Sequence, residues 1–355
     1  MFEQLKVLEI ASVLAGPLVG TFFAELGARV TKIENKRTGG DVTRTWKLPS
    51  EPPDAPCSAY YASANYGKKT MLLDFRDEGD YRQVLDLAAA ADVVIANFKP
   101  GDARKLRLDY PMLRAVNSRL IYAELTGFGE DDPRPAFDVV LQAESGFMYM
   151  NGEKGGKPLK MPVAMIDILA AHQLKQGILC ALMRRMQHGR GCRVHVSLFD
   201  AAVSSLANQA TNWLMAGHIP QPIGSCHPNI APYGDMYLTL DRKWLVLSVG
   251  NNRQFTQLCE ALNIAELSSN PDFSTNRNRV ARREQLNEVI GRAISRQNGT
   301  HWEQLFLSEQ IPFGLIRDIQ DVFTKPQSQK LILEEVTEGT RTRRVKNAVF
   351  TISDS

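Results

Sequence analysis

Short apolar runs alternate with amphipathic segments through the first half of the chain. The runs have the length and composition of buried strands, and the segments between them space their apolar residues as helices do. We expect strands at residues 5–10, 30–33, 93–96 and 120–125, and helices at residues 18–26 and 77–90. This alternation predicts an α/β fold with an open parallel sheet, Rossmann-like in architecture. Ligands of such sheets bind beyond the carboxyl ends of the strands, so we expect a site on the loops after Ile10, Ile33, Ala96 and Leu125.

The pattern changes near residue 220. Proline, glycine and serine crowd residues 220–232, which we interpret as a linker. Before the linker we expect a long helix at 168–187, a strand at 193–196 and a helix at 200–217. Beyond it we expect antiparallel strands at 237–239 and 244–249, and helices at 253–262 and 283–294. The prediction is therefore a large Rossmann-like domain at 1–219, completed by 332–355, and a linker with a smaller α+β domain at 220–331.

Composition narrows the classes of function. Of the 355 residues, 44% are hydrophobic and 23% charged, and the net charge of +3 gives no case for a nucleic-acid partner. The five cysteines include no C-x-x-C pair, so we expect reduced thiols in a cytoplasmic protein, with neither disulfides nor a metal site. The amino terminus lacks the features of a signal peptide, and no apolar stretch is long enough to span a membrane, so we expect no membrane partner.

Ten segments follow one another in a fixed order along nearly the whole chain. They are VLEIASVLAGP, LGARVTKIE, NYGKKTMLLD, DVVIANFKPG, NSRLIYAELTGFG, FDVVLQAESG, MIDILAAHQLKQGILCALMRR, GRGCRVHVSLFDA, HPNIAPY and VGNNRQF. In this order they resemble the class III CoA-transferases of the CaiB/BaiF type, which include formyl-CoA and carnitine CoA-transferases. The resemblance implies a Rossmann-like domain that binds coenzyme A, a smaller domain, and a homodimer of interlocked rings. It also implies transfer of CoA from an acyl-CoA donor to a small mono- or dicarboxylic acid, with coenzyme A as a substrate and no tightly bound cofactor.

The family's nucleophilic aspartate falls on Asp167, in the segment MIDILAAHQ. The resemblance implies that this carboxylate attacks a thioester, and that an aspartyl anhydride and an aspartyl-CoA thioester follow. Asp167 directly precedes the helix predicted at 168–187, whose exposed N–H groups favour an anion and are expected to keep the carboxylate ionised at neutral pH. On the isolated segment Asp167 is simply an N-cap, and both roles are compatible.

Other positions near the reaction carry over with an ordinary alternative beside each. Asp138 matches an acidic position of the family that binds or orients the acceptor, and capping of its own helix is the alternative. Gln142 lies one turn later and faces the same way, or is a surface amide. Gly127 and Gly129 bring N–H groups to a thioester oxygen, or only permit a turn. Gly250 stands where the family has a mobile glycine-rich segment, but one glycine remains here, so we expect a stiffer polar wall.

The resemblance also places coenzyme A against the first loops of the large domain. The corresponding positions are Val13, Leu14 and Ala15 in the first loop, Asn35, Lys36 and Arg37 after the second strand, Leu73 and Arg76 at the adenosine end, Asn97 and Phe98 after the strand at 93–96, and Lys105 near a phosphate. For the cations the alternative is a solvated surface charge. For Val13, Leu73 and Phe98 it is core packing.

Three other functions stay open. α-Methylacyl-CoA racemases share the fold and the aspartate, but they use a histidine where this chain has Phe137, and proton transfer needs such a titrating group. Glu34 ends the second strand as in NAD-dependent oxidoreductases, although the first loop lacks the pattern G-x-G-x-x-G. A non-catalytic CoA-binding protein is the third, because family members continue past the strand expected at 348–352 with a helical tail, whereas this chain stops at Ser355.

Overall fold

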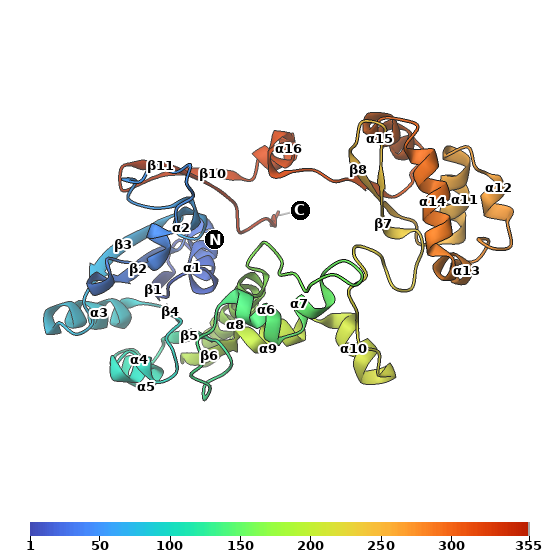
Figure 1. The fold of residues 1–355 in the computed structure, drawn as a ribbon. Coiled ribbons are helices and arrows are strands. Elements are labelled where there is room, and N and C mark those ends of the chain that lie inside the picture. The colour runs from blue at the N-terminus through green and yellow to red at the C-terminus, as the bar shows by residue number, and fades with distance from the viewer. Residues whose placement is uncertain (354–355) are drawn as a thin grey trace. The chain divides into compact units, whose positions relative to one another are not determined.

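A parallel sheet of six strands forms the core of the larger of two compact units (Figure 1). The computed structural model describes residues 1–353 of the chain. Neighbouring strands follow the order β3-β2-β1-β4-β5-β6 and all pairs are parallel, which is the doubly wound order of Rossmann folds. The strands are β1 (Lys6–Ile10), β2 (Arg29–Asn35), β3 (Lys68–Leu73), β4 (Val93–Ala96), β5 (Ile121–Thr126) and β6 (Cys192–Ser197). The sheet confirms the predicted α/β class.

The strands lie close to their predicted positions, with one addition. β4 has the predicted bounds, and all of its residues are buried, as expected of a parallel strand covered on both faces. β3 escapes prediction because its first residues, Lys68 and Lys69, look like surface positions. The structure instead buries the side chain of Lys68 completely. A strand that carries a buried lysine has no alternating or continuous apolar pattern for sequence reasoning to detect.

Helices cover both faces of this sheet (Figure 1). On one face α1 and α8 pack through residues such as Phe23 and Ala170. On the other face α3 and α5 pack through residues such as Val84 and Leu113. These four helices are α1 (Ala15–Glu25), α3 (Glu78–Ala90), α5 (Tyr110–Val116) and α8 (Met165–His188). The sheet is therefore the middle of three layers, and its strand ends remain open for loops.

Most of the remaining helices are short, and one prediction about them was wrong. The helix predicted at 200–217 is two helices, because the backbone of Ala207, where α10 begins, has a φ of +47°, outside the right-handed helical region. The short elements are η1 (Lys36–Thr38), η2 (Val42–Thr45), α2 (Ala59–Ser63), α4 (Asp102–Lys105), α6 (Asp138–Glu144), α7 (Phe147–Met150), α9 (Leu198–Ser204), α10 (Ala207–Ala216) and α17 (Pro326–Gln329).

The smaller unit is a three-stranded antiparallel sheet with helices on it. The two predicted strands pair as expected, and α14 has the predicted bounds. Its elements are β7 (Tyr233–Leu238), β8 (Trp244–Ser248), β9 (Phe313–Leu315), α11 (Asn252–Ala261), α12 (Glu266–Ser269), α13 (Asn276–Ala281), α14 (Arg283–Ile294), α15 (Gly299–Ser308) and α16 (Ile319–Thr324).

The division between the units differs from the predicted one at residues 149–159. These residues belong to the smaller unit together with 220–326, whereas we expected them in the large domain. The carbonyl oxygen of Gly152 accepts the N–H of Gly224 at 2.8 Å, and the hydroxyl of Tyr149 donates to Gln221 at 3.2 Å. Partners some 72 residues apart in sequence hold this segment, so local pattern could not assign it.

The last described residues return to the larger unit. β10 (Ile332–Thr337) and β11 (Thr340–Val345) form an antiparallel hairpin. Just beyond it, the N–H of Asn347 donates to the carboxylate of Glu25 in α1, at 2.8–2.9 Å, and Arg344 forms a buried ion pair with the same carboxylate. The strand expected at 348–352 was wrong, because the structure has no strand over those residues.

Candidate active site

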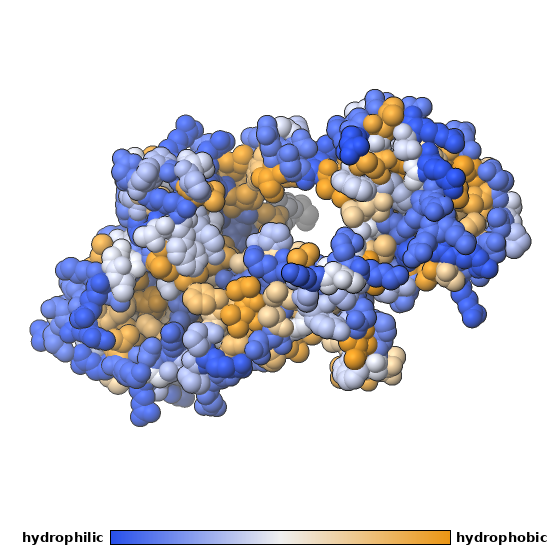
Figure 2. Space-filling view, in the orientation of Figure 1, coloured by the Kyte–Doolittle hydropathy of each residue, from blue (hydrophilic) through white to orange (hydrophobic). Residues whose placement is uncertain are grey.

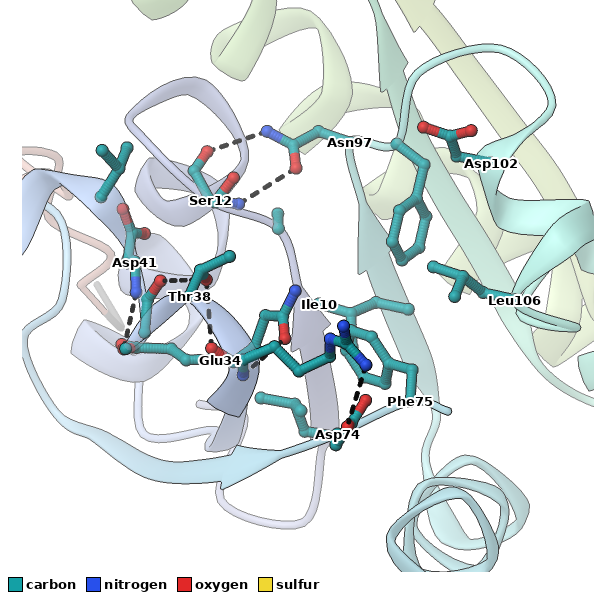
Figure 3. Close-up of a pocket in the computed structure, with 18 of the residues that line it drawn as sticks. Ile10, Ser12, Glu34, Thr38, Asp41, Asp74, Phe75, Asn97, Asp102 and Leu106 are labelled. Atoms are coloured by element: carbon teal, nitrogen blue, oxygen red, sulfur yellow. Dashed lines mark hydrogen bonds and ion pairs between the residues drawn. The ribbon is translucent and has the colours of Figure 1, made fainter. Parts of the chain in front are cut away.

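A cavity of about 860 Å³ opens at the carboxyl ends of β1, β2, β3 and β4 (Figure 3). The loops after Ile10, Ile33 and Ala96 line it as predicted, whereas the loop after Leu125 does not. β1 and β4 are neighbours whose connections leave in opposite directions, so the cavity lies at the switch point where ligands of doubly wound sheets bind. Its size is within the range of small-molecule sites, roughly 300–1,000 Å³.

The structure places some of the residues predicted to contact coenzyme A on this cavity and others away from it. Those on its wall are Asn35, Arg37, Arg76, Asn97, Phe98 and Lys105. Those elsewhere are Val13, Leu14, Ala15, Lys36 and Leu73. Leu73 is buried among core residues such as Tyr81, which is the packing role that we kept as its alternative. Lys36 is exposed, and Leu14 and Ala15 are buried at the start of α1.

The cations on the cavity wall differ in whether they have partners. Arg37 lies 3.9 Å from the carboxylate of Asp74, and Lys105 lies 2.8 Å from that of Asp102. Within residues 1–353 no ion pair holds Arg76 or Lys99, which leaves both available to an anionic ligand. Sequence reasoning missed Lys99, although its place directly after Phe98 in NFKPG was a usable signal.

Asp167 lies in the first turn of α8, not in front of it. The helix begins at Met165, and its N-cap residue, Ala164, offers no side-chain cap. The carboxylate of Asp138 takes over that function, because its Oδ1 accepts the N–H of Ile166 at 2.7 Å. The N-cap interpretation of Asp167 was therefore wrong. An acceptor from another helix caps α8 and leaves the carboxylate of Asp167 free.

Asp138 and Gln142 form one hydrogen-bonded unit at this helix end. The amide of Gln142 donates to Oδ2 of Asp138 at 2.5 Å, and its carbonyl accepts the N–H of Met161 at 2.7 Å. Gln142 is fully buried, so the surface-amide alternative was wrong. Asp138 begins α6 but caps α8, which differs from the predicted capping of its own helix. Together the two side chains fix the chain that leads into Asp167.

The surroundings of Asp167 raise its pKa to about 7. Burial is the main cause, because it penalises the charged form, and the negative charge of Asp138 adds to it. The side chain is only 8% exposed, and it makes no hydrogen bond or ion pair within residues 1–353. The expectation was a carboxylate that the helix end keeps ionised at neutral pH, whereas burial and Asp138 bring its pKa to about 7. A carboxylate that is half-ionised at neutral pH can act as a nucleophile or as a base.

Tyr60 is a member of this site that sequence reasoning missed. Its pKa rises to about 12, first through burial and then through the carboxylates of Asp167, Asp138 and Asp41. The ring packs edge-on against Trp46, with centroids 5.1 Å apart. Tyr60 therefore keeps its proton at neutral pH, and its hydroxyl is a hydrogen-bond donor within the electrostatic reach of Asp167. No signal in the sequence marked it, since only the fold brings α2 near α8.

The two glycine loops have local explanations. A Cβ on Gly127 would lie 2.2 Å from that of Ala136, so close packing requires glycine there, and Gly129 has a φ of +117°. In the smaller unit, the N–H of Gly250 donates to the side chain of Gln254 at 2.9 Å, and Asn251 caps α11. The Gly250 segment is thus pinned by side chains of its own helix.

Neither a metal centre nor a membrane span is found among residues 1–353. No group of three or more His, Cys, Asp or Glu side chains is arranged to hold a metal ion. No helix in this part of the chain is long and apolar enough to cross a membrane.

Comparisons with known proteins point in one direction. The model of CoA-transferase family III matches residues 2–355. The chain is 37% identical over 331 residues to the succinate–glutarate CoA-transferase of Agrobacterium fabrum, covering 92% of this chain and 82% of that protein. It is 34% identical over 331 residues to the acetyl-CoA:oxalate CoA-transferase of Acetobacter aceti, covering 92% and 83%. Its fold matches the crystal structure of a CAIB/BAIF family protein from Brucella suis with a TM-score of 0.85, at 36% identity over 99% of this chain and 93% of that one.

Proposed function

We propose a reaction for this chain, which belongs to CoA-transferase family III. It is an enzyme of that class, and CoA thioesters are its substrates. We propose that the donor is an acyl-CoA, that the acceptor is a small dicarboxylic acid, and that Asp167 is the nucleophile. One observation carries this assignment: the buried carboxylate of Asp167 has no partner within residues 1–353, and its pKa is about 7.

The proposed steps balance without ATP or a net proton. A carboxylate oxygen of Asp167 bonds to the thioester carbon, the C–S bond breaks, and a mixed anhydride and CoA thiolate result. The thiolate attacks the aspartyl carbon, which releases the donor acid and leaves an aspartyl-CoA thioester. The carboxylate of the acceptor then attacks this carbon, forming a second anhydride and freeing the thiolate. Attack of the thiolate on the acceptor carbonyl yields the new acyl-CoA and restores Asp167.

The surroundings of Asp167 support this chemistry. At pH 7 about half of the Asp167 side chains carry the negative charge that attack requires, because the pKa is about 7. Burial removes the water that would otherwise hydrolyse an anhydride. Tyr60 stays protonated and supplies a donor for a carboxylate or an oxyanion.

The cavity supports binding of coenzyme A in the larger unit. The nucleotide end of CoA carries phosphates, and Arg76 and Lys99 are cations on the cavity wall that lack ion-pair partners within residues 1–353. Phe98 and Phe75 pack edge-on on the same wall, with ring centroids 6.4 Å apart, and offer apolar surface. We propose that coenzyme A enters and leaves as substrate and product and is not held as a tightly bound cofactor.

We also propose that two copies of the chain associate, as the interlocked rings of the family imply. α10 has no buried residue, and Trp213, Leu214 and Met215 are 53%, 79% and 84% exposed. Figure 2 shows apolar side chains gathered over this helix, at the lower right of the view. Soluble monomers seldom expose such surface, and a second copy is the natural cover. Light scattering on the wild-type chain and on Leu214→Glu measures whether the dimer forms and whether α10 contributes.

The reaction is tested in two ways: a screen of carboxylic acids as acceptors, and trapping of the covalent enzyme intermediate with hydroxylamine. Succinyl-CoA and acetyl-CoA are offered as donors against succinate, glutarate, oxalate, mesaconate and itaconate, and new acyl-CoA is read by mass spectrometry. Incubation with donor and hydroxylamine should convert Asp167 to a hydroxamate. Asp138→Asn serves as the matched control, because it should keep the label.

The outcomes separate the parts of the proposal. A hydroxamate on any residue other than Asp167, or full turnover by Asp167→Asn, would remove Asp167 as nucleophile. Exchange of deuterium at the α-carbon of the acyl group without transfer would identify a racemase instead. Transfer to none of these dicarboxylic acids would overturn the proposed acceptor class.

A further inference from the structure

Side chains from two other segments hold the backbone of the first loop, residues 11–14, which connects β1 to α1. Asn97 clamps Ser12 twice: its Oδ1 accepts the N–H of Ser12 at 3.0 Å, and its amide donates to the carbonyl at 2.8 Å (Figure 3). From the other side, Oδ2 of Asp41 accepts the N–H of Val13 at 3.1 Å. Ser12, Asn97 and Asp41 all line the cavity. The loop thus forms part of the wall of the candidate CoA site, and side-chain hydrogen bonds fix its backbone at Ser12 and Val13.

The loop does not adopt this shape by its own preference. Val13 has a φ of +71°, which is rare for any residue except glycine and a clear outlier for a β-branched one. A residue stays in such a conformation only when its surroundings hold it there. The acceptor that Asp41 supplies to the Val13 N–H is therefore a restraint against the loop's preferred shape.

Asp41 is in turn held by a buried group of charges. We call Glu9, Lys32, Asp41 and Lys68 the buried charge cluster; all four side chains lie on the larger unit. Lys32 Nζ lies 3.0 Å from Asp41 and 3.2 Å from Glu9, and the side chains of Lys32, Asp41 and Glu9 have no exposed surface. Lys68 Nζ lies 2.7 Å from the other carboxylate oxygen of Glu9. The cluster runs from the middle of the sheet to the first loop.

The two lysines of the cluster also reach both ends of the loop. Lys32 Nζ donates to the carbonyl of Ala11 at 3.2 Å, where β1 ends. Lys68 Nζ donates to the carbonyl of Pro17 at 2.8 Å, in the first turn of α1. With Asp41 on Val13 between them, the cluster contacts the start, the middle and the far side of the connection.

The Lys32–Asp41 pair is charged at neutral pH. Burial alone lowers the pKa of Lys32, but Glu9 and Asp41 outweigh it and the pKa rises. Burial likewise raises the pKa of Asp41, but Lys32 and Thr43 outweigh it and the pKa falls. Every group that faces the Asp41 carboxylate is a donor: Val13 N–H, Lys32, and the N–H and hydroxyl of Thr43. An amide in this place would set donor against donor.

Buried ion pairs are seldom the most stable way to fill a core, because apolar residues of similar size do as well or better. What this cluster supplies is direction, since it places oppositely charged groups on chosen backbone atoms of one loop. We infer that the buried charge cluster, through Asp41, is the positioning device of the first loop and sets the shape of the cavity wall for CoA. The inference rests on the proposed binding of coenzyme A at this cavity.

The test replaces the charged pair by apolar residues that leave no unpaired charge. Lys32→Met with Asp41→Leu removes the Val13 restraint and the Ala11 contact, while Lys68 keeps Glu9 as its partner. The matched control is Glu25→Gln with Arg344→Met, which removes a buried ion pair at the far end of α1 in the same unit. Three quantities are measured on the full chain: unfolding temperature, hydrogen exchange of the peptide that contains Ser12 and Val13, and affinity for CoA alone.

We expect the cluster variant to stay folded, to lose exchange protection in the first loop, and to bind CoA at least about tenfold more weakly, since ordering even one backbone residue on binding costs about that factor. The control should keep both loop protection and CoA affinity. Wild-type protection and affinity in the cluster variant would overturn the inference.

Two further outcomes are kept apart. If the cluster variant fails to fold, the same quantities are measured on Asn97→Ala. This variant frees Ser12 without removing a buried charge. Unchanged loop protection and CoA affinity in it would count against a positioned loop. If the wild-type chain binds no CoA, the proposed function fails. Exchange of the loop then still reports whether the cluster positions it.

Discussion

Asp41 and Asp167 are buried carboxylates of the same unit, and they differ in almost everything else. Asp41 accepts hydrogen bonds from four donors, among them a lysine, and its pKa is lowered. Asp167 has no partner within residues 1–353, and its pKa is raised to about 7. Burial acts on both in the same direction, so the difference comes from the donors that one has and the other lacks.

A structural carboxylate differs from a reactive one in whether the fold provides hydrogen-bond donors for its charge. A buried charge costs free energy unless it is paired, and the fold compensates that cost at Asp41. At Asp167 no donor offsets the cost of burial, although nearby donors bind the carboxylate of Asp138. A fold that keeps an uncompensated carboxylate beside a capped helix end is one in which the carboxylate has another use.

The largest expected effect is that of Asp167→Asn, which keeps the shape and removes the charge. Loss of the nucleophile should lower transfer by at least about a thousandfold. Stability should change the other way. The folded state holds the Asp167 proton more tightly than the unfolded chain, so the penalty is absent below pH 3.8, grows as pH rises, and is complete above about pH 7. The variant should therefore gain on the order of 4 kcal/mol above pH 7 and nothing near pH 3.8.

Denaturant unfolding at several pH values, with transfer measured on the same samples, checks both halves. A variant less stable than wild type at pH 8 would mean that Asp167 has a partner in solution, and the contrast with Asp41 would be lost.

Asp41→Ala should lower the free energy of unfolding, the opposite of the change expected for Asp167→Asn. It leaves Lys32 buried without its nearest partner and Val13 without an acceptor, which should lower the free energy of unfolding by about 3–5 kcal/mol. The loss should be largest at neutral pH and shrink as acid protonates the wild-type carboxylate, because a lowered pKa contributes stability only above the usual pKa of 3.8. Urea unfolding at pH 7 and at about pH 2, well below the usual pKa of 3.8, measures this. An equal loss at both values would contradict an ionised Asp41.

Gly20→Ala should disturb the cluster from its other side by a smaller amount. Alanine is the better helix former, and in an exposed helix the change would stabilise by about 1 kcal/mol. Here the added Cβ would lie 1.8 Å from a carboxylate oxygen of Glu9, so we expect a net loss of about 1–3 kcal/mol. Gly101→Ala is no fair control because its φ is +84°, whereas Gly291→Ala, in α14, is, since the added Cβ would lie 3.7 Å from Tyr237. A stabilised Gly20→Ala would show that Glu9 moves freely.

The smallest effect is expected of Asp138→Asn. It removes the like charge that adds to the pKa of Asp167 and keeps an oxygen to accept the Ile166 N–H, while its amide nitrogen then faces the amide of Gln142. The acid limb of kcat/KM should therefore move below about pH 7, by the lesser part of the rise, since burial is the larger cause. A pH–rate profile of wild type and variant measures the midpoint. A limb that stays in place would remove Asp138 from the electrostatics of Asp167.

Local pattern was enough for much of the fold. The four apolar residues of β4 and the amphipathic α14 have their predicted bounds, because burial on both faces or on one face leaves a clear period in the sequence. β3 and the break at Ala207 were not predicted. A buried lysine and a residue with positive φ leave no hydrophobic period in the sequence.

For the site, the sequence supplied residue types and the fold supplied their relations. Asn97 lies on the wall of the cavity, whereas Asp167 lies within the first turn of α8 and not in front of it. That Asp138 caps a helix starting 27 residues later, at Met165, follows from tertiary packing alone. The electrostatic effect of Asp167 on Tyr60 also follows from tertiary packing. The burial of Lys68 does too, although lysine is usually a surface residue.

The contact of Glu25 with Arg344 and Asn347 has a consequence for synthesis. Glu25 leaves the ribosome early, but its partners follow about 319–322 residues later. At about 5–20 residues per second, that is a wait of roughly 15 to 65 s. During this time the smaller unit, whose residues lie within 149–326, is complete while the larger one still has a buried acid without its base. We expect the nascent chain to mature from the inside of its sequence outwards, with the first helix among the last parts to reach its final state.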